Sequence, residues 1–279
     1  MQLQWYPGHM TKAKRMMQED MKLIDLVIEL LDARAPESSR NPDIDELAKG
    51  KSRLILLNKS DLSDQRANEK WLEYYTGKGF VTLLLDSKNR KGFSAINRSV
   101  EEACSKKMER DRKRGIVGRP VRAMVVGIPN VGKSTFINSL CKKASTKTGN
   151  KPGVTKGKQW IRLDKNVELL DTPGILWPKF SNEETGVNLA FIGSISDDIL
   201  DPVEVAMELI EKVKVLYPQC LSDRFGTDES KQTAVILEDI AIKRGCLKKG
   251  NEPDFDKAAT VVINEFRSGK LGRITLEMP

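Results

Sequence analysis

The chain of 279 residues is poor in the side chains that bind metals or form disulfides, with four widely spaced cysteines and one histidine, His9. Because no two cysteines form a C-x-x-C pair, a structural zinc site and a disulfide scaffold are both disfavoured. No apolar run approaches the roughly 18 residues that span a bilayer, and residues 1–8 lack the apolar stretch of a signal peptide. The sequence therefore predicts no membrane span and a reducing, cytoplasmic location.

Charge of the two signs is unevenly distributed along the chain. Residues 1–180 hold 35 Lys and Arg against 21 Asp and Glu, whereas residues 181–279 hold 12 against 18. A basic excess favours a polyanionic partner for the first part, although charge alone does not distinguish that from an ordinary basic protein. The most charged stretch, residues 105–114, mixes both signs. It is interpreted as a solvated helix end and linker, with contact to phosphates as the second interpretation.

Hydrophobic patterning divides the chain in two. Short apolar runs typical of buried parallel strands lie at residues 26–31, 54–57, 81–85, 123–126 and 167–170, and helical patterns lie at 11–23, 43–48, 66–75, 95–107 and 134–141. Their alternation predicts an α/β doubly wound, mostly parallel sheet over residues 1–180. After residue 181 only helical patterns follow, at 201–216, 235–241 and 255–266. Residues 181–279 are therefore predicted to form a small all-α domain.

The strongest motif is the phosphate-binding loop Gly127-Ile-Pro-Asn-Val-Gly132-Lys133-Ser134, which follows a predicted strand and opens a predicted helix. Its backbone N–H groups and the helix N-terminus would hold phosphates. We expect Lys133 to reach the β- and γ-phosphates and the Ser134 hydroxyl to bind Mg²⁺. The candidate nucleotide contacts of this loop are Asn130, Val131, Gly132, Lys133, Ser134 and Thr135.

A second motif, Asp171-Thr-Pro-Gly174, follows the last predicted strand. Asp171 is expected to hold Mg²⁺ through water, and the Gly174 N–H is expected to sense a γ-phosphate. Thr155, in a Gly- and Pro-bearing loop between the two motifs, is the preferred switch threonine for Mg²⁺, with Thr146 and Thr148 as alternatives.

The third motif, Asn58-Lys59-Ser60-Asp61, follows the strand at residues 54–57. The Asp61 carboxylate can accept from guanine N1–H and the 2-amino group, which adenine cannot offer there. Asn58 is expected to address the other edge of the base, and the Lys59 stem to pack on its face. Ser87 and Lys88, after the strand at 81–85, would offer a backbone N–H to the guanine O6.

These are the elements of a Ras-like GTPase in a permuted order, because the base-reading motifs precede the phosphate loop. The site is built from loops at strand ends, so chain order does not fix which loops meet. Residues 105–120 can join the termini of the unpermuted fold. The permutation also places the helical domain directly after the 171–174 loop, which responds to the γ-phosphate.

The chain resembles the circularly permuted GTPases over nearly its whole length. The shared motifs are Trp5-Tyr-Pro-Gly-His-Met10, Asp32-Ala-Arg34, Ser38-Ser-Arg-Asn-Pro42, residues 58–61, residues 127–134, Gly149-Asn-Lys-Pro-Gly-Val-Thr155 and Asp171-Thr-Pro-Gly-Ile-Leu-Trp-Pro178. The resemblance implies GTP hydrolysis coupled to late maturation of the large ribosomal subunit. It also implies that the helical domain contacts ribosomal RNA. The expected partner is the large-subunit precursor, with its RNA and proteins, rather than DNA, and a monomer is expected.

Hydrolysis is expected to be slow without the particle, because Ile175 stands where Ras-like proteins place a water-orienting glutamine. His9 could replace that group or be a structural residue. The predicted catalytic set is His9, Lys133, Thr155 and Gly174. Asn130 resembles the asparagine that helps bind a stimulating K⁺ in relatives without the glutamine, or it serves the turn geometry alone.

Two other functions are compatible with parts of the pattern. One is a non-catalytic, GTP-dependent RNA-binding assembly factor, in which Ile175 marks lost hydrolysis. The other is a P-loop ATPase or kinase, which residues 58–61 disfavour.

Overall fold

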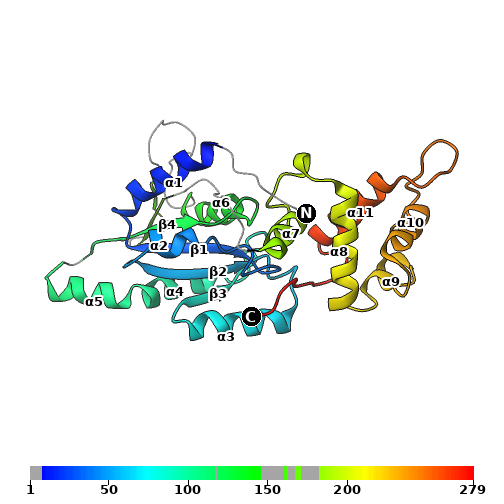
Figure 1. Ribbon diagram of the computed structural model, residues 1–279. Coiled ribbons are helices and arrows are strands. Elements are labelled where there is room, and N and C mark those ends of the chain that lie inside the picture. Colours follow the sequence, from blue (N-terminus) through cyan, green and yellow to red (C-terminus); the bar gives the residue numbers. More distant parts are fainter. Residues whose placement is uncertain (1–7, 117, 146–159, 163–166, 171–181) are drawn as a thin grey trace.

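The computed structural model describes residues 8–116, 118–145, 160–162, 167–170 and 182–279, with the backbone only for residues 8–14 and 142–145. Its centre is a six-stranded sheet in the order β3-β2-β1-β4-β6-β5 (Figure 1). The strands are β1 (Leu26–Asp32), β2 (Ser52–Asn58), β3 (Val81–Leu84), β4 (Val121–Val126), β5 (Trp160–Arg162) and β6 (Val167–Leu170). Every pairing is parallel except that of β5 with β6. The predicted doubly wound, mostly parallel sheet is confirmed.

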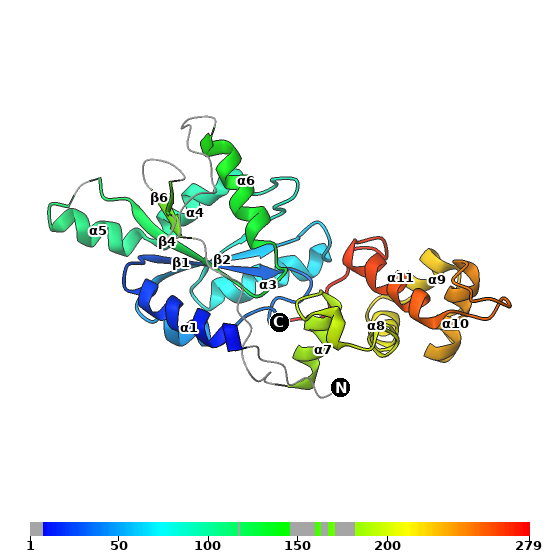
Figure 2. The ribbon, with the colours of Figure 1, turned by 90° about the horizontal axis from the view of Figure 1, so that it is seen from above.

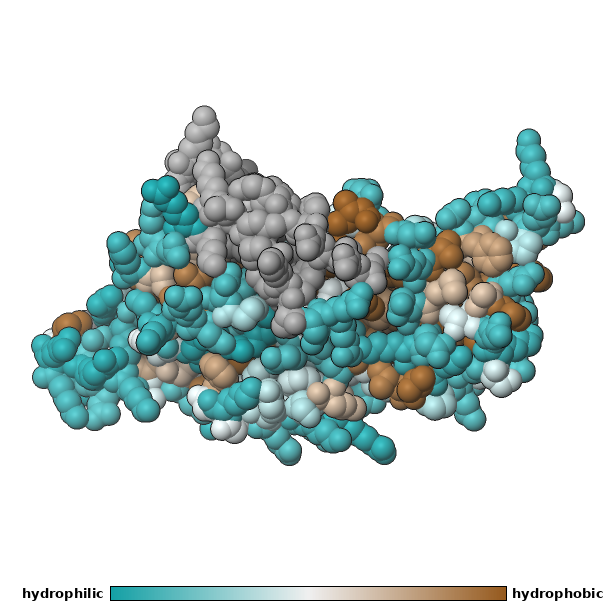
Figure 3. Space-filling view, in the orientation of Figure 1, coloured by the Kyte–Doolittle hydropathy of each residue, from teal (hydrophilic) through white to brown (hydrophobic). Residues whose placement is uncertain are grey.

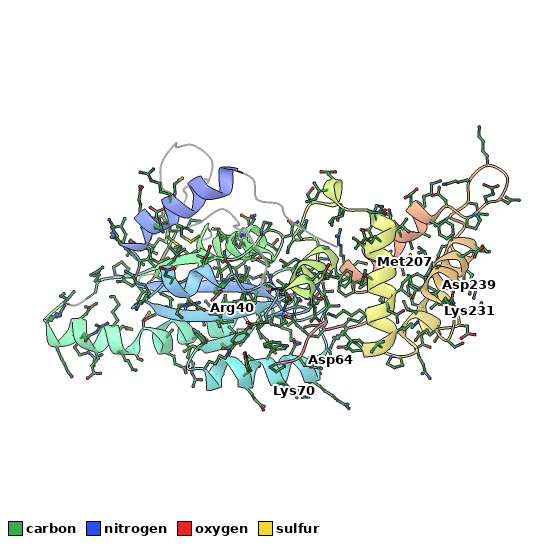
Figure 4. All side chains as sticks on the ribbon, in the orientation of Figure 1. Arg40, Asp64, Lys70, Met207, Lys231 and Asp239 are labelled. Atoms are coloured by element: carbon green, nitrogen blue, oxygen red, sulfur yellow. The ribbon has the colours of Figure 1, made fainter. Side chains whose placement is uncertain are left out.

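Helices cover both faces of the sheet because the strands bury side chains on both sides. The helices of this part are α1 (Gly8–Met21), α2 (Asp43–Leu47), α3 (Gln65–Gly77), α4 (Ile96–Ala103), α5 (Ser105–Lys113) and α6 (Lys133–Ser145). Leu30 of β1 packs in one buried cluster with residues of α4 and α6. Its neighbour Leu31 packs instead with Trp71 and Tyr75 of α3. Asp64 caps α3 by accepting from the Ala67 N–H at 2.9 Å (Figure 4).

The prediction of a single helix over residues 95–107 is wrong. Two helices, α4 and α5, meet at Cys104, whose φ of −96° and ψ of 3° end the first helix. Nothing in the sequence marks this break, since no glycine or proline lies there. The charged residues 105–114, interpreted as a helix end and linker, instead form a helix of their own. It projects from the α/β part at the end farthest from α8–α11 (Figures 1 and 2).

The described residues after 181 form helices and no strand, as predicted. These helices are α7 (Glu183–Phe191), α8 (Pro202–Leu216), α9 (Cys220–Phe225), α10 (Thr233–Lys243) and α11 (Phe255–Arg267). Asp201 caps α8 by accepting from the Val203 N–H at 2.8 Å, as its position before Pro202 indicates. Helices α7 and α9 were not predicted. Among the described residues, no helix is long and apolar enough to cross a membrane.

The last residues of the chain return to the α/β part, which the sequence did not indicate. The Ile274 and Leu276 N–H groups donate to the carbonyls of Leu62 and Arg34 at 3.1 and 2.7 Å. Glu277 accepts from the Ser38 hydroxyl at 2.6 Å. We call residues 274–277 the C-terminal clasp. The domain boundary between residues 180 and 181 stays a prediction. The clasp shows that residues after 181 also contact the α/β part.

Candidate nucleotide-binding site

Two of the predicted loops lie together at the carboxyl edge of the sheet. Residues 58–61 follow β2 and residues 127–134 follow β4, and β1 lies between these two strands. In the register of the β1–β2 pair, Asp32 stands opposite Asn58. Ligands bind at this edge of open parallel sheets, where loops from neighbouring strands converge. The permuted order of the motifs therefore still yields one site.

The backbone of the phosphate loop depends on two glycines. Gly127 has a φ of 157°, and a Cβ there would lie 2.6 Å from the Leu30 carbonyl oxygen. Gly132 has a φ of 98°, and a Cβ there would lie 2.5 Å from Asn58 Nδ2. Any side chain at either position would displace the loop from its neighbours. The loop then runs into α6, which begins at Lys133.

The Lys133 ammonium is held by the loop itself. Its Nζ donates to the carbonyl oxygens of Gly127 and Ile128 at 3.0 and 2.9 Å, and the side chain is buried. Ser134 and Thr135 are exposed at the start of the helix, whereas Val131 is buried. The helix N-terminus that these residues form is the arrangement that favours phosphate groups.

Asn58 bridges neighbouring loops in this structure, and the base contact expected of it stays a prediction. Its Nδ2 donates to the Val131 carbonyl at 2.7 Å, and its Oδ1 accepts from the Ser87 N–H and hydroxyl at 3.0 and 2.8 Å. The residue is fully enclosed, with 2% of its surface exposed. Asn58 thus ties three loops together, and its amide holds the phosphate loop at a fixed distance from the loop after β3.

The loop after β3 is closed by its own hydrogen bonds. Asp86 Oδ1 accepts from the Lys88 N–H at 3.0 Å, and Ser139 of α6 donates to the Ser87 carbonyl at 2.9 Å. The N–H groups of both Ser87 and Lys88 are therefore engaged with protein atoms. Asp61 lies in the turn after β2 and is partly exposed, so its carboxylate can meet a ligand.

Lys59, in the loop of residues 58–61, contacts the phosphate loop and the buried Asp32. With a φ of 60° it sits in the left-handed region, and its Nζ donates to the Asn130 carbonyl at 2.7 Å and pairs with Asp32 Oδ2 at 2.9 Å. Burial alone would raise the pKa of Asp32, but the charges of Arg34 and Lys59 outweigh it and hold this pKa well below its usual range. Asp32 is therefore ionised and fixes Lys59.

Arg34 belongs to the shared motif Asp32-Ala-Arg34, and no role for it was predicted from the sequence. It is almost fully buried and donates to both carboxylate oxygens of Asp32, at 2.9 and 2.8 Å. Its guanidinium also lies 5.2 Å from the centre of the Phe266 ring and donates to the Arg267 carbonyl at 3.3 Å. A buried arginine thus connects the end of β1 with the end of α11.

The phosphate loop itself contacts the helical part. Asn130 Nδ2 donates to the Gly193 carbonyl at 2.6 Å, and the Ser194 hydroxyl donates to the Pro129 carbonyl at 2.9 Å. Arg267 holds the same segment, because it donates to the Phe191 carbonyl at 3.0 Å at the end of α7. No motif signalled these contacts, since their partners lie more than 60 residues apart.

Several predicted site residues lie outside what the structure describes. Thr155, Asp171 and Gly174 fall in the undescribed segments, as do Thr146, Thr148 and Ile175, and the His9 side chain is likewise not described. Within the described part, no group of three or more His, Cys, Asp or Glu side chains could hold a metal ion. The expected Mg²⁺ ligands thus have one described member, Ser134, whose exposed hydroxyl at the helix start fits that role.

Comparisons with known proteins agree with this geometry. A family model described as 50S ribosome-binding GTPase matches residues 122–236. The ribosome biogenesis GTPase A of Priestia megaterium is 47% identical over all of this chain and 98% of its own length. That of Thermotoga maritima is 34% identical over 99% of this chain and 95% of its own length.

Solved structures extend the comparison to the fold. A GNP-bound YlqF from T. maritima has a TM-score of 0.70 at 29% identity, over 96% of this chain and 98% of that one. A GDP-bound YlqF has a TM-score of 0.71 at 28% identity, over 95% of this chain and 99% of that one. The order of the motifs, their convergence at one sheet edge and these likenesses lead to one conclusion. The chain belongs to the ribosome biogenesis GTPase A family of circularly permuted GTPases.

Proposed function

We propose that this GTPase assists late maturation of the large ribosomal subunit, that it hydrolyses GTP slowly alone and that the pre-ribosomal particle accelerates the reaction. The observation that carries the proposal is the Asn58 bridge, which joins the base-reading loop to the phosphate loop in one site. Relatives over the full length of the chain are named ribosome biogenesis GTPases. A mouse relative, 33% identical, is named a mitochondrial ribosome-associated GTPase. The protein is proposed to act in the cytoplasm as a monomer.

The proposal includes Mg²⁺ as a cofactor, held by Ser134 with Thr155 and Asp171, where it would neutralise phosphate charge. Lys133, Gly132 and the helix start would hold the phosphates, and Asp61 the guanine. K⁺ at Asn130 is a further proposal. The side-chain amide of Asn130 already donates to Gly193, and its φ of 61° serves the turn, so both of its interpretations stay open.

Single-turnover cleavage of GTP, with and without large-subunit precursor particles, tests this function. We expect slow cleavage by the protein alone and a clear acceleration on the particle. Absence of cleavage in both conditions, with GTP still bound, would favour the non-catalytic assembly factor. Running the assay in potassium and in sodium salts tests the K⁺ proposal in the same experiment.

His9 is proposed to act on the hydrolytic water or the γ-phosphate, because Ile175 cannot. His9→Ala should lower particle-stimulated kcat by about 10²-fold or more and leave GTP affinity nearly unchanged, as expected for a group that acts in the transition state. Stopped-flow kinetics and equilibrium binding of a fluorescent GTP analogue measure the two quantities. Unchanged stimulated turnover would refute the catalytic role, and a parallel loss of affinity would make His9 structural.

Nucleotide state is proposed to set the affinity for the particle, because the helical part follows the 171–174 loop and also touches the phosphate loop. Binding should be tighter with a non-hydrolysable GTP analogue than with GDP, by about 5- to 150-fold. Ser194→Ala removes the hydrogen bond to Pro129 without touching the nucleotide and should reduce this ratio.

Sedimentation at fixed salt measures that ratio. Ser222→Ala is the control, since its hydroxyl donates to Gln219 at 2.8 Å within the helical part. We expect the control to keep the wild-type ratio. Equal particle affinity of the wild type in both nucleotide states would contradict coupling. A ratio unchanged by Ser194→Ala would show that the hydrogen bond to Pro129 does not carry the coupling.

A further inference from the structure

The charged residues of α5 differ in what they contact, although residues of both signs are mixed in its sequence. On the side facing the body, Lys107 pairs with Asp111 at 2.6 Å and lies 3.7 Å from Asp25. Lys107 and Asp111 are both largely enclosed, and with Met108 and Arg112 they line a cavity of about 220 Å³ against the starts of β4 and β6. Asp111, one of the two acidic residues of the helix, is thereby paired on the side that faces the body.

A row of basic residues lies along the helix next to the side that faces the body. Lys106, Arg110 and the C-cap residue Arg114 are four residues apart, so their side chains follow one side of the helix and its end. All three are exposed, and none forms an ion pair with a residue that the structure describes. The other acid, Glu109, is paired with Lys113 at 2.8 Å in an exposed bridge, which contributes little. We call Lys106, Arg110 and Arg114 the α5 basic row.

The position of the row suits a large partner. Helix α5 projects from the α/β part at the end opposite α8–α11, and both views of the ribbon agree on this (Figures 1 and 2). The surface at this end is mostly hydrophilic in Figure 3, although Met108 and Ile116 are exposed there at 41% and 42%. A phosphate backbone demands only cations at regular spacing on a convex, accessible element.

We infer that the α5 basic row is an RNA-binding surface that contacts the phosphate backbone of the ribosomal particle. The inference deepens the proposed function and rests on it, because it names an RNA contact made by the GTPase part. Together with the helical part at the other end of the molecule, such a contact would fix the GTPase site at two separated points on the particle. The row reads no base sequence and supplies affinity alone.

The test is the triple variant K106Q/R110Q/R114Q, since glutamine retains helix propensity and removes charge. The matched control is K49Q/R66Q/K70Q. These three residues are also exposed, lack ion pairs among the described residues and change the net charge equally, and Lys70 is labelled on α3 in Figure 4. Affinity for the large-subunit precursor and for its deproteinised RNA is measured by sedimentation from 50 to 300 mM salt, a range chosen around physiological ionic strength.

The α5 variant should bind both the particle and the RNA about 10- to 100-fold more weakly, and the slope of log K against log salt should become shallower by about 2 to 3, one phosphate contact being lost per residue. The control should keep most of the affinity and slope. GTP-analogue binding should be unchanged in both variants, which shows that they fold.

Three results would overturn the inference: equal loss in the two variants, an unchanged salt slope, or loss on the particle without loss on the RNA, which indicates a protein partner. Failure of the wild type to bind the particle at all would instead reject the proposed function.

Discussion

Asp61→Asn should weaken GTP binding by about 10²- to 10⁴-fold, since the charged acceptor of two hydrogen bonds, worth about 1.5–3 kcal/mol each, becomes a neutral amide whose N–H opposes the guanine 2-amino group. The variant should prefer xanthosine triphosphate, because an amide can donate to the 2-oxo group of xanthine and still accept from N1–H. Asp61 lies in the turn after β2 and is accessible. Isothermal titration with GTP, ATP and xanthosine triphosphate measures the three affinities.

The control for this variant is Asp64→Asn, three residues along the chain. The Asp64 side chain caps α3, so its replacement should leave nucleotide preference unchanged and cost only some stability. If Asp61→Asn retains the preference for GTP over the other two nucleotides, Asp61 does not read the base.

Arg34→Ala should lower the free energy of unfolding by about 3–5 kcal/mol, the usual cost of leaving a buried charge without its main partner. Asp32 would keep Lys59 but lose both hydrogen bonds from the guanidinium. The contact between β1 and α11 would also be lost. Urea denaturation followed by circular dichroism, with the midpoint and slope fitted together, gives the change.

Two further variants make the Arg34 result specific. Arg66→Ala on the exposed side of α3 should change stability by less than about 0.5 kcal/mol. The double variant D32A/R34A should cost less than the sum of its single variants, because the unpaired carboxylate is gone. A loss below about 1 kcal/mol for Arg34→Ala would show that Asp32 and Lys59 suffice without it.

The sequence predicted the parts of this molecule whose signals are local. Five of the six strands lie where branched apolar runs occur, and the phosphate loop lies between its strand and helix. Strand β5 was missed because it is a three-residue antiparallel edge strand with no periodicity to detect. The break at Cys104, a fully buried residue, was missed because no glycine or proline marks it in the sequence.

The contacts that tune the site could not be predicted, because their partners are distant in sequence. Arg34 and Arg267 are separated by 233 positions. Asn58 illustrates a different obstacle. An amide at the end of β2 suits both base recognition and a bridge between loops, and the hydrogen bonds to Val131 and Ser87, which the motif does not reveal, show the bridge.

The C-terminal clasp also orders the events of folding. Ser38 and Glu277 meet across 239 positions, and the carbonyl of Leu62, which follows the 58–61 loop, accepts from the Ile274 N–H. Contacts of such long separation require the closure of a large loop before they contribute, which slows their formation. During synthesis the first strands can pair long before residues 274–277 leave the ribosome. The 58–61 side of the candidate site therefore acquires the support of Ile274 only after residues 1–273 have been made.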